Sequence, residues 1–217
     1  IQGYADILLS EHLGKLTDKQ KERISIIKSS SETLLALISD LLDAQKLELG
    51  QLKIRKENAN IKDTVTNTVK LFLPQAQKNK IEIISNVQDL SIEHDPERIK
   101  QVITNLIKNS LTAVEPEKGK IEISMKELPQ AIQISVKDNG MGIPMDKQSN
   151  LFKKFYQVDA TLTRERGGSG LGLSICKGIL ENHGGTITVK SIPNQETIFT
   201  FTLPKKAESG KSPIGLA

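Results

Sequence analysis

The stretch Asp138-Asn139-Gly140-Met141-Gly142 combines a charged residue with two glycines at the end of a predicted strand. It follows residues 131–137, where apolar and polar residues alternate with a period of two, as in a half-buried strand. Asp138 has the parity of the apolar positions, so a continuing strand turns its carboxylate toward the core. A buried carboxylate needs hydrogen-bond donors, and glycines bring bare backbone close to it. The pattern fits a site for a planar ligand with an amino group, such as adenine; the alternative is a strand that ends in an Asp-capped turn.

The length and composition are those of a globular protein with one good core and a smaller module. The 217 residues are 26% charged and 37% hydrophobic, with a net charge of +4. Basic residues are spread along the chain and aromatic residues make up only 3%, which argues against a nucleic-acid partner. The single cysteine, Cys176, excludes an internal disulfide and fits a reducing compartment. No apolar run approaches the ~20 residues that span a bilayer and no secretory signal is recognised, so we expect a cytoplasmic location and no membrane contact by these residues.

Residues 1–51 predict a helical hairpin. A first helix is indicated over residues 1–12 and ends by Gly14, and Thr17 with Gln20 has the form of a capping box for a second helix that runs to about Leu49. The inner positions of the second helix alternate in spacing between four and three, the heptad of a bundle; they are Gln20, Ile24, Ile27, Ser31, Leu34, Ile38, Leu41 and Gln45. Two helices cannot close a core of this width. We therefore expect a four-helix homodimer through residues 1–51; the alternative is a hairpin packed on the domain that follows.

Residues 52–204 predict a domain that mixes helices with a largely antiparallel sheet. The expected strands are 52–55, 81–84, 91–93, 120–126, 131–137, 186–190 and 197–203. The expected helices are 61–78 with a bend or end near Pro74, 96–114 capped by Asp95, and 169–182. Residues 142–166 predict a long loop, which is typical of a functional lid. The predicted class is α+β, a two-layer α/β sandwich preceded by the hairpin and followed by a disordered tail over residues 205–217.

Asn105 and Asn109 lie four residues apart on the predicted helix 96–114 and share one face at the edge of its apolar side. Asn is only a middling helix former, so the pair needs an explanation. One interpretation is a satisfied core amide at Asn105 and a solvated amide at Asn109. The other is that Asn109 offers its carbonyl oxygen to a Mg²⁺ that holds phosphates, because Mg²⁺ takes few protein ligands where phosphates supply the rest.

The run Gly167-Gly168-Ser169-Gly170-Leu171-Gly172 opens the predicted helix that ends near His183. Free backbone N–H groups at a Gly-rich helix start bind phosphate well. The run is not a P-loop, because Leu173 stands where that loop requires Lys. It is not a Rossmann turn either, because it reads Gly-x-Gly-x-Gly and does not follow a strand. We therefore predict a phosphate site of another kind.

Four segments, in this order, resemble the boxes of sensor histidine kinases of two-component systems. They are Asn105 to Asn109 for the asparagine box, 138–142 for the first glycine box, 151–156 for the phenylalanine box and 168–173 for the second glycine box. The resemblance covers residues 95–203 and implies the ATP-binding fold of the gyrase, chaperone and mismatch-repair superfamily. The hairpin resembles the dimerisation module of the same family. The implied ligands are ATP and Mg²⁺, with a mobile lid between the glycine boxes.

The resemblance also implies which residues bind ATP. They are Asn105, Lys108, Asn109, Asp138, Gly140, Gly142, Ile143, Tyr156, Gly168, Ser169, Gly170, Leu171, Gly172 and Thr197. Within this set, Asp138 would accept from the adenine amino group, Thr197 would lie near the adenine, and Asn109 would bind Mg²⁺. Phe152 and Phe155 would anchor the lid to the core.

One position separates a kinase from an ATPase. ATPases of the superfamily resemble one another in having Glu four residues before the metal Asn, where it activates water. Here that position is Asn105, which is no general base, so the γ-phosphate is expected to await a side-chain nucleophile.

The phospho-accepting His of the family is followed by an acid, and this box is not found here. Residues 1–4 resemble the segment directly after it, so the acceptor is expected upstream of Ile1 and these 217 residues are not expected to autophosphorylate. His12 lies several turns too far along the helix. His94, at a predicted helix cap, and His183, at a helix end, are expected to be structural.

Two further positions depart from the family pattern. Thr112 and Gln157 stand where many members have a basic residue. Lys108, or Arg164 or Arg166 in the predicted lid, could supply the charge. The sequence therefore predicts the Mg-ATP-binding region of a histidine kinase, whose phosphoryl group passes through a His to an Asp of a response-regulator receiver domain. The alternative is a catalytically weak, nucleotide-binding dimerisation module.

Overall fold

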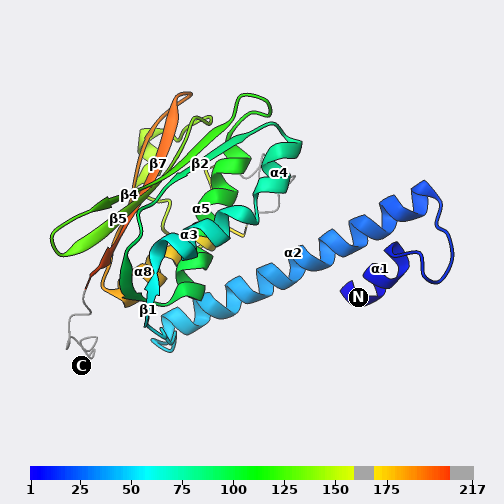
Figure 1. The fold of residues 1–217 in the computed structure, drawn as a ribbon, viewed down its shortest axis with the longest axis horizontal. Helices are drawn as coiled ribbons and strands as arrows, with labels where there is room; N and C mark the ends of the chain where they lie inside the picture. The colour runs from blue at the N-terminus through cyan, green and yellow to red at the C-terminus, as the bar shows by residue number, and fades with distance from the viewer. Residues whose placement is uncertain (159–168, 206–217) are drawn as a thin grey trace.

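The computed structural model describes residues 1–158 and 169–205, and it consists of a helical hairpin followed by an α/β sandwich. Figure 1 shows helix α2 (Asp18–Glu48) projecting from the sandwich, with α1 (Gln2–Leu9) beside its far half. The C-terminal part of α2 lies against α8 (Gly172–His183) of the sandwich. Among the described residues, no helix is both long and apolar enough to cross a membrane.

The start of α2 is the predicted capping box. The side chain of Thr17 accepts from the backbone N–H of Gln20 at 3.3 Å, and Gln20 Oε1 accepts from the N–H of Thr17 at 2.8 Å. Two backbone donors are satisfied in this way, which accounts for the well-defined start of the helix. At the other end, Gly50 has a φ of +62°, a conformation that glycine adopts without steric cost and that ends α2 as predicted.

The main sheet has five strands in the order β2-β4-β5-β7-β6. Their bounds are Glu82–Asn86 for β2, Lys120–Glu127 for β4, Ala131–Asp138 for β5, Ile187–Ile192 for β6 and Glu196–Pro204 for β7. β2 pairs with β4 in parallel and the other neighbours are antiparallel, so the sheet is mixed and largely antiparallel, as predicted. A second, two-stranded sheet joins β1 (Glu57–Asn60) to β3 (Ser91–His94).

Helices cover one face of the main sheet and form the second layer of the sandwich (Figure 1). Their bounds are Ile61–Lys70 for α3, Leu73–Lys78 for α4, Pro96–Ala113 for α5 and Gly172–His183 for α8. A short helix, α6 (Met145–Gln148), contacts β6. The core lies between these layers: Ile132, Ile134 and Val136 of β5 are fully buried, and so are five apolar residues of α5, which are Ile99, Val102, Ile103, Leu106 and Ile107. The period-two pattern of β5 therefore points its apolar side chains, and with them Asp138, toward the helices.

Two predicted elements were wrong in part. Leu52 to Arg55 is not a strand: Leu52 is buried in the core, and the backbone N–H of Arg55 donates to the Asp95 side chain rather than to a neighbouring strand. The strand lies further along the chain, at β1, where β3 offers a partner.

The predicted helix 61–78 is divided near Pro74, as expected, into α3 and α4, and Pro74 sits in the first turn of α4, where its missing N–H costs nothing. The predicted helix 169–182 begins only at Gly172, because Gly170 has a φ of +69°, which is not helical. Within the predicted loop 142–166, the short helix α6 was not expected. Residues 159–168, in the predicted lid, and residues 206–217, in the predicted tail, lie outside the described residues.

Candidate functional site

The carboxylate of Asp138 is the buried polar centre of the site. It lies at the end of β5 and is only 2% exposed. Its Oδ2 accepts from the hydroxyl of Ser110 on α5 at 2.8 Å, and its Oδ1 accepts from the backbone N–H of Gly140 at 3.0 Å. Burial raises the pKa of Asp138, while the hydrogen bonds from Ser110 and Gly140 oppose that rise. A carboxylate offers about four acceptor positions, so two remain for a ligand that donates.

The glycines after Asp138 allow the backbone to pass where a side chain could not fit. A Cβ on Gly140 would lie 2.7 Å from the carbonyl oxygen of Ala113, the residue whose oxygen accepts from Met141 N at 3.1 Å. Gly142 has a φ of +68°, and a Cβ there would lie 2.3 Å from the carbonyl oxygen of Ile192. The turn is therefore wedged between the end of α5 and the β6–β7 connection, which fixes the direction in which Asp138 faces.

Thr197 and Ile143 lie beside this turn. Thr197 is the β7 partner of Asp138 in the sheet and is 3% exposed. Its hydroxyl contacts Ser191 Oγ at 2.9 Å, and the same Ser191 oxygen accepts from the backbone N–H of Ile143 at 2.8 Å. Ser191 thus joins the strand pair β6–β7 to the start of the segment that follows the first glycine box.

The side chains of α5 near the site differ in burial. Lys108 and Asn109 are exposed, Asn105 is half-buried, and Ser110 is fully buried. Asn105 Nδ2 donates to the carbonyl oxygen of Gly172 at 3.4 Å and lies 3.6 Å from the Cys176 sulfur. The amide of Asn105 therefore connects α5 to the start of α8 and has partners there, while the amide of Asn109 faces solvent.

The glycine segment, defined here as residues 169–172, leads into α8. Ser169 Oγ accepts from the backbone N–H of Leu171 at 3.2 Å. A Cβ on Gly170 would lie 2.8 Å from the backbone of Phe155, which itself has a φ of +60°. The segment therefore lies directly on the end of the phenylalanine box, whose Tyr156 is half-buried. Gly168 lies outside the described residues, as do Arg164 and Arg166.

One predicted anchor of this region is confirmed and the other is wrong. Phe152 packs against the hydrophobic core. Phe155 is 67% exposed, because its left-handed backbone against Gly170 turns the ring away from the core.

The residues present fit a Mg²⁺ that is held mainly by a nucleotide. Among residues 1–158 and 169–205, no group of three or more His, Cys, Asp or Glu side chains could hold a metal ion. An all-protein metal cage is thus not found in the described part of the chain. The exposed amide oxygen of Asn109 is the kind of single oxygen ligand that Mg²⁺ accepts when phosphates complete its coordination.

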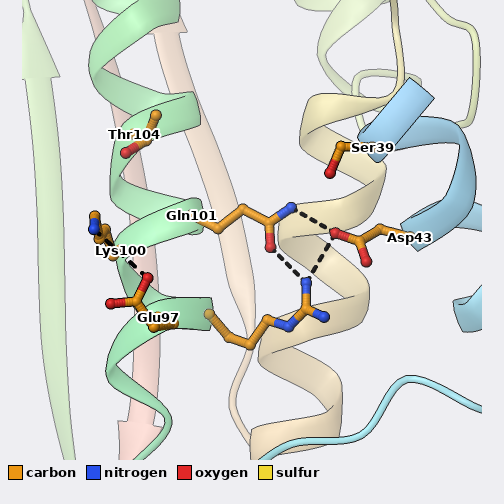
Figure 2. Close-up of a pocket in the computed structure, with 7 residues that line it drawn as sticks. Ser39, Asp43, Glu97, Lys100, Gln101 and Thr104 are labelled. Atoms are coloured by element: carbon orange, nitrogen blue, oxygen red, sulfur yellow. Dashed lines mark hydrogen bonds and ion pairs between the residues drawn. The ribbon is translucent and has the colours of Figure 1, made fainter. Parts of the chain in front are cut away.

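Helix α2 touches the sandwich beside this site. Arg98 of α5 donates to Asp43 of α2 at 2.8 Å, and Gln101 donates to the same Asp43 oxygen at 2.9 Å. Figure 2 shows the Gln101 side chain reaching from α5 toward Asp43, while Glu97 and Lys100 point to the other side of α5. These residues line an open cavity of about 360 Å³ between the two helices. Asp138 and the glycine turn do not line this cavity.

Two residues of the site were missed at the level of sequence. Ser110 follows Leu106 by four residues and Ile107 by three, so helical spacing already placed it on the buried side of α5. Asp40 of α2, whose Oδ2 accepts from Ser169 at 3.2 Å, gave no such signal, because 129 residues separate it from its partner.

Two of the three histidines are structural, as predicted, and the cysteine is buried. His183 Nε2 accepts from the backbone N–H of Asp95 at 3.1 Å, which leaves Nδ1 to donate to the carbonyl oxygen of Ile179 at 2.8 Å. His94 contacts Thr64 and the Ile92 carbonyl, and burial lowers the pKa of both imidazoles. Burial raises the pKa of the Cys176 thiol to about 12, so it is unreactive at neutral pH.

Two family models match the chain. Residues 94–207 match the histidine kinase-, DNA gyrase B- and HSP90-like ATPases, and residues 1–50 match the His Kinase A (phospho-acceptor) domain. The circadian input-output histidine kinase CikA of Synechococcus elongatus is 34% identical over 209 residues, which are 94% of this chain and 28% of CikA. The chain spans about a quarter of the length of the curated relatives it matches.

Two solved structures have the same architecture. Full-length ShkA in complex with AMPPNP matches with a TM-score of 0.77 at 26% identity, over 94% of this chain and 42% of ShkA. The histidine kinase ThkA in complex with the response regulator protein TrrA matches with a TM-score of 0.69 at 26% identity, over 96% of this chain and 58% of ThkA. Both matches extend over the hairpin as well as the sandwich.

Proposed function

The chain belongs to the family of histidine kinase-, DNA gyrase B- and HSP90-like ATPases, and from this membership we propose that it is the dimerisation and catalytic region of a two-component histidine kinase that binds Mg-ATP. The observation that carries the proposal is the buried Asp138 carboxylate, with acceptor positions to spare beside a glycine turn. A buried carboxylate that remains partly unsatisfied suits the exocyclic amino group of adenine. Thr197 and Ile143 flank this adenine end.

The phosphates would then extend toward the glycine segment and the exposed edge of α5. The start of α8 offers backbone N–H groups and the positive end of a helix dipole. Lys108 would add a positive charge and Asn109 a ligand for Mg²⁺. When bound, Mg²⁺ would supply charge neutralisation on the phosphates. The residues of the chain would hold the nucleotide in position, which is most of what phosphoryl transfer asks of a protein.

Transfer to a side chain, rather than to water, is supported by the surroundings of Asn105. Its amide is engaged with Gly172 and Cys176, and an amide cannot take a proton from water. We also propose that none of the three histidines in this chain accepts the phosphoryl group. His94 and His183 are buried with both ring nitrogens engaged, and His12 is paired with Ser10 at the helical turn.

A homodimer is supported by the apolar surface of the hairpin. Several large apolar side chains of α2 are about half exposed in the single chain; they are Ile26, Ile27, Leu34, Leu35, Ile38, Leu41 and Leu42. A patch of this length on a helix pair is typical of a bundle interface. A response-regulator receiver domain is the proposed downstream partner, because the structure of ThkA in the matched complex contains the response regulator TrrA.

The second candidate is a nucleotide-binding dimerisation module with weak catalysis. It is favoured by one observation: positions 112 and 157 carry Thr and Gln, which add no positive charge near the proposed phosphates. Both candidates bind ATP. They differ once the chain is supplied with a phospho-accepting helix, since only the kinase then forms acid-labile phosphohistidine.

The test of the shared premise is ATP binding measured by calorimetry with and without Mg²⁺. Asp138→Asn removes the charged acceptor and should lower ATP affinity by a factor of at least about 10, the cost of leaving a donor unpaired in a buried site. Asp63→Asn, which changes an exposed Asp of α3, is the matched control and should bind like the wild type. Equal ATP affinity in Asp138→Asn and the control would refute the adenine site, and equal affinity with and without Mg²⁺ would refute the metal role of Asn109.

A further inference from the structure

A carboxylate of α2 lies at the phosphate end of the proposed site. Asp40 Oδ2 accepts from Ser169 Oγ at 3.2 Å, and the same Ser169 oxygen accepts from the backbone N–H of Leu171 at 3.2 Å. The hydroxyl therefore links the carboxylate to the backbone of the glycine segment. Since α8 begins directly afterwards, at Gly172, Asp40 approaches the positive end of its helix dipole.

The groups that stabilise the charge of Asp40 are the same groups that would contact a bound phosphate in the proposed site. Burial raises the pKa of Asp40 and the charge of Asp43 raises it further, while the Ser169 hydrogen bond and the positive charge of Lys108 lower it. Lys108 is the only lysine that sequence analysis assigned to the phosphates. Hydroxyl, helix terminus and lysine thus all act on an anion that the protein itself provides.

Contacts on the same part of α2 hold Asp40 in this place. Three residues further on, Asp43 pairs with Arg98 and Gln101 of α5. One turn beyond, Leu47 covers Gly178, where a Cβ would lie 2.6 Å from Leu47 Cδ2. Glu48 then pairs with Lys154. Residues 40–48 therefore dock on the sandwich as one surface, and the position of Asp40 follows from that docking.

We propose that Asp40 is an internal competitor of nucleotide phosphate, so that docking of residues 40–48 of α2 and occupation of the glycine segment by phosphate oppose each other. The inference rests on the proposed ATP site and adds a regulatory residue to it. Asp138 lies at the other end of the site, bonded to Ser110 and Gly140. The opposition should therefore act on the phosphates and not on the adenine, and it should be stronger for ATP than for ADP.

The competition has a reciprocal consequence. If docked α2 weakens ATP binding, ATP must weaken the docking of α2 by the same factor. Binding of the nucleotide would then free the hairpin from the sandwich, and loss of the nucleotide would favour the docked arrangement seen here.

The test compares wild type, Asp40→Asn and Glu32→Gln. Asp40→Asn keeps the shape and an acceptor for Ser169 but removes the charge. Glu32→Gln makes the same change of net charge at an exposed position of the same helix. Calorimetry measures Mg-ATP and Mg-ADP, and an NMR titration measures adenosine. We expect Asp40→Asn to bind ATP about fivefold more tightly or better, ADP with a smaller gain and adenosine unchanged, and Glu32→Gln to match the wild type throughout.

Hydrogen exchange of residues 40–48 gives an independent readout. ATP should speed exchange there in the wild type and have little effect in Asp40→Asn, where the charge that couples the two events is gone. Unchanged or weaker ATP affinity in Asp40→Asn, with normal adenosine binding, would overturn the inference while leaving the ATP site intact. Failure of the wild type to bind either ATP or adenosine would refute the proposed function itself, and the competitor with it.

Discussion

The two ends of the proposed nucleotide site differ in burial and in where their hydrogen-bond partners lie. The adenine end consists of Asp138, Ser110 and Thr197, which are at most 3% exposed and whose hydrogen bonds stay within the sandwich. The phosphate end consists of exposed or half-exposed groups, which are Lys108, Asn109 and Ser169. One of them, Ser169, is hydrogen-bonded to Asp40 of helix α2, outside the sandwich.

This difference indicates which end recognises and which end can be regulated. A buried site whose hydrogen bonds lie within the domain is fixed by the same packing that folds the domain, so it cannot change without cost to stability. An exposed site shared with a helix that docks through only a few contacts can change at small cost. We infer that the adenine end serves recognition, and that the phosphate end responds to the position of α2.

Substitution of one glycine at each end should show the largest difference in stability between the two ends. Gly142→Ala would place a methyl group 2.3 Å from the Ile192 carbonyl oxygen at a φ of +68°, so we expect a loss of about 2–5 kcal/mol of unfolding free energy. A Cβ from Gly172→Ala at the phosphate end would have the Asn105 amide as its nearest neighbour, at an ordinary 3.5 Å, within a helix. Its stability should change by less than about 1 kcal/mol. Urea denaturation measures both variants.

Equal losses in the two glycine variants would contradict the comparison, because they would mean that the phosphate end is packed as rigidly as the adenine end. Gly3→Ala serves as the control for the handling of the protein, since a Cβ there meets no atom within 4 Å.

Much of the adenine end could be predicted from sequence because its signals are local. The alternation of residues 131–137 placed Asp138 on the core side, and the structure buries it there. The spacing of Ser110 to Leu106 and Ile107 also places its hydroxyl on the buried side of α5, so this donor to Asp138 has a local signal too. Periodicity fixes which side of an element is buried, and this is what the adenine end depends on.

The phosphate end could be predicted only in part, because it depends on contacts distant in sequence. The pattern of α2 predicts a bundle heptad, which concerns one face of the helix. Asp40 and Asp43 lie off the predicted heptad positions and contact the sandwich. The strand expected at Leu52 to Arg55 failed for a related reason: its alternation was local, but the partner that a strand requires was not there.

Substitution of one serine at each end should show a smaller difference in stability of the same kind. Ser110→Ala leaves Asp138 buried with the Gly140 N–H as its remaining donor, so we expect a loss of about 1–3 kcal/mol of unfolding free energy. Ser169→Ala removes a hydrogen bond to a half-exposed carboxylate, and the loss should stay below about 1 kcal/mol. Denaturation midpoints of the two variants, compared with wild type, give the result. A larger loss for Ser169→Ala would show that the phosphate end supports the fold more than the adenine end does.

The smallest effect is expected in the pH dependence of the two carboxylates. The folded-state pKa of Asp138 is raised by burial, so the protonated form is favoured and its stabilising contribution is present at low pH and lost as the pH rises through that pKa. Asp138→Asn has no such loss. Its unfolding free energy relative to wild type should therefore increase from about pH 4, the ordinary Asp value, toward neutral pH. The buried histidines titrate in both proteins and cancel in this difference.

Asp40→Asn should show the same sign with a smaller slope, because Asp40 is half-exposed and its rise is opposed by Ser169 and Lys108. Urea denaturation at several pH values between 4 and 7 gives both curves. A difference that stays flat with pH for Asp138→Asn would mean that the hydrogen bonds from Ser110 and Gly140 fully offset its burial. The carboxylate would then have no unmet need for a donor, and its electrostatics would not favour the amino group of adenine.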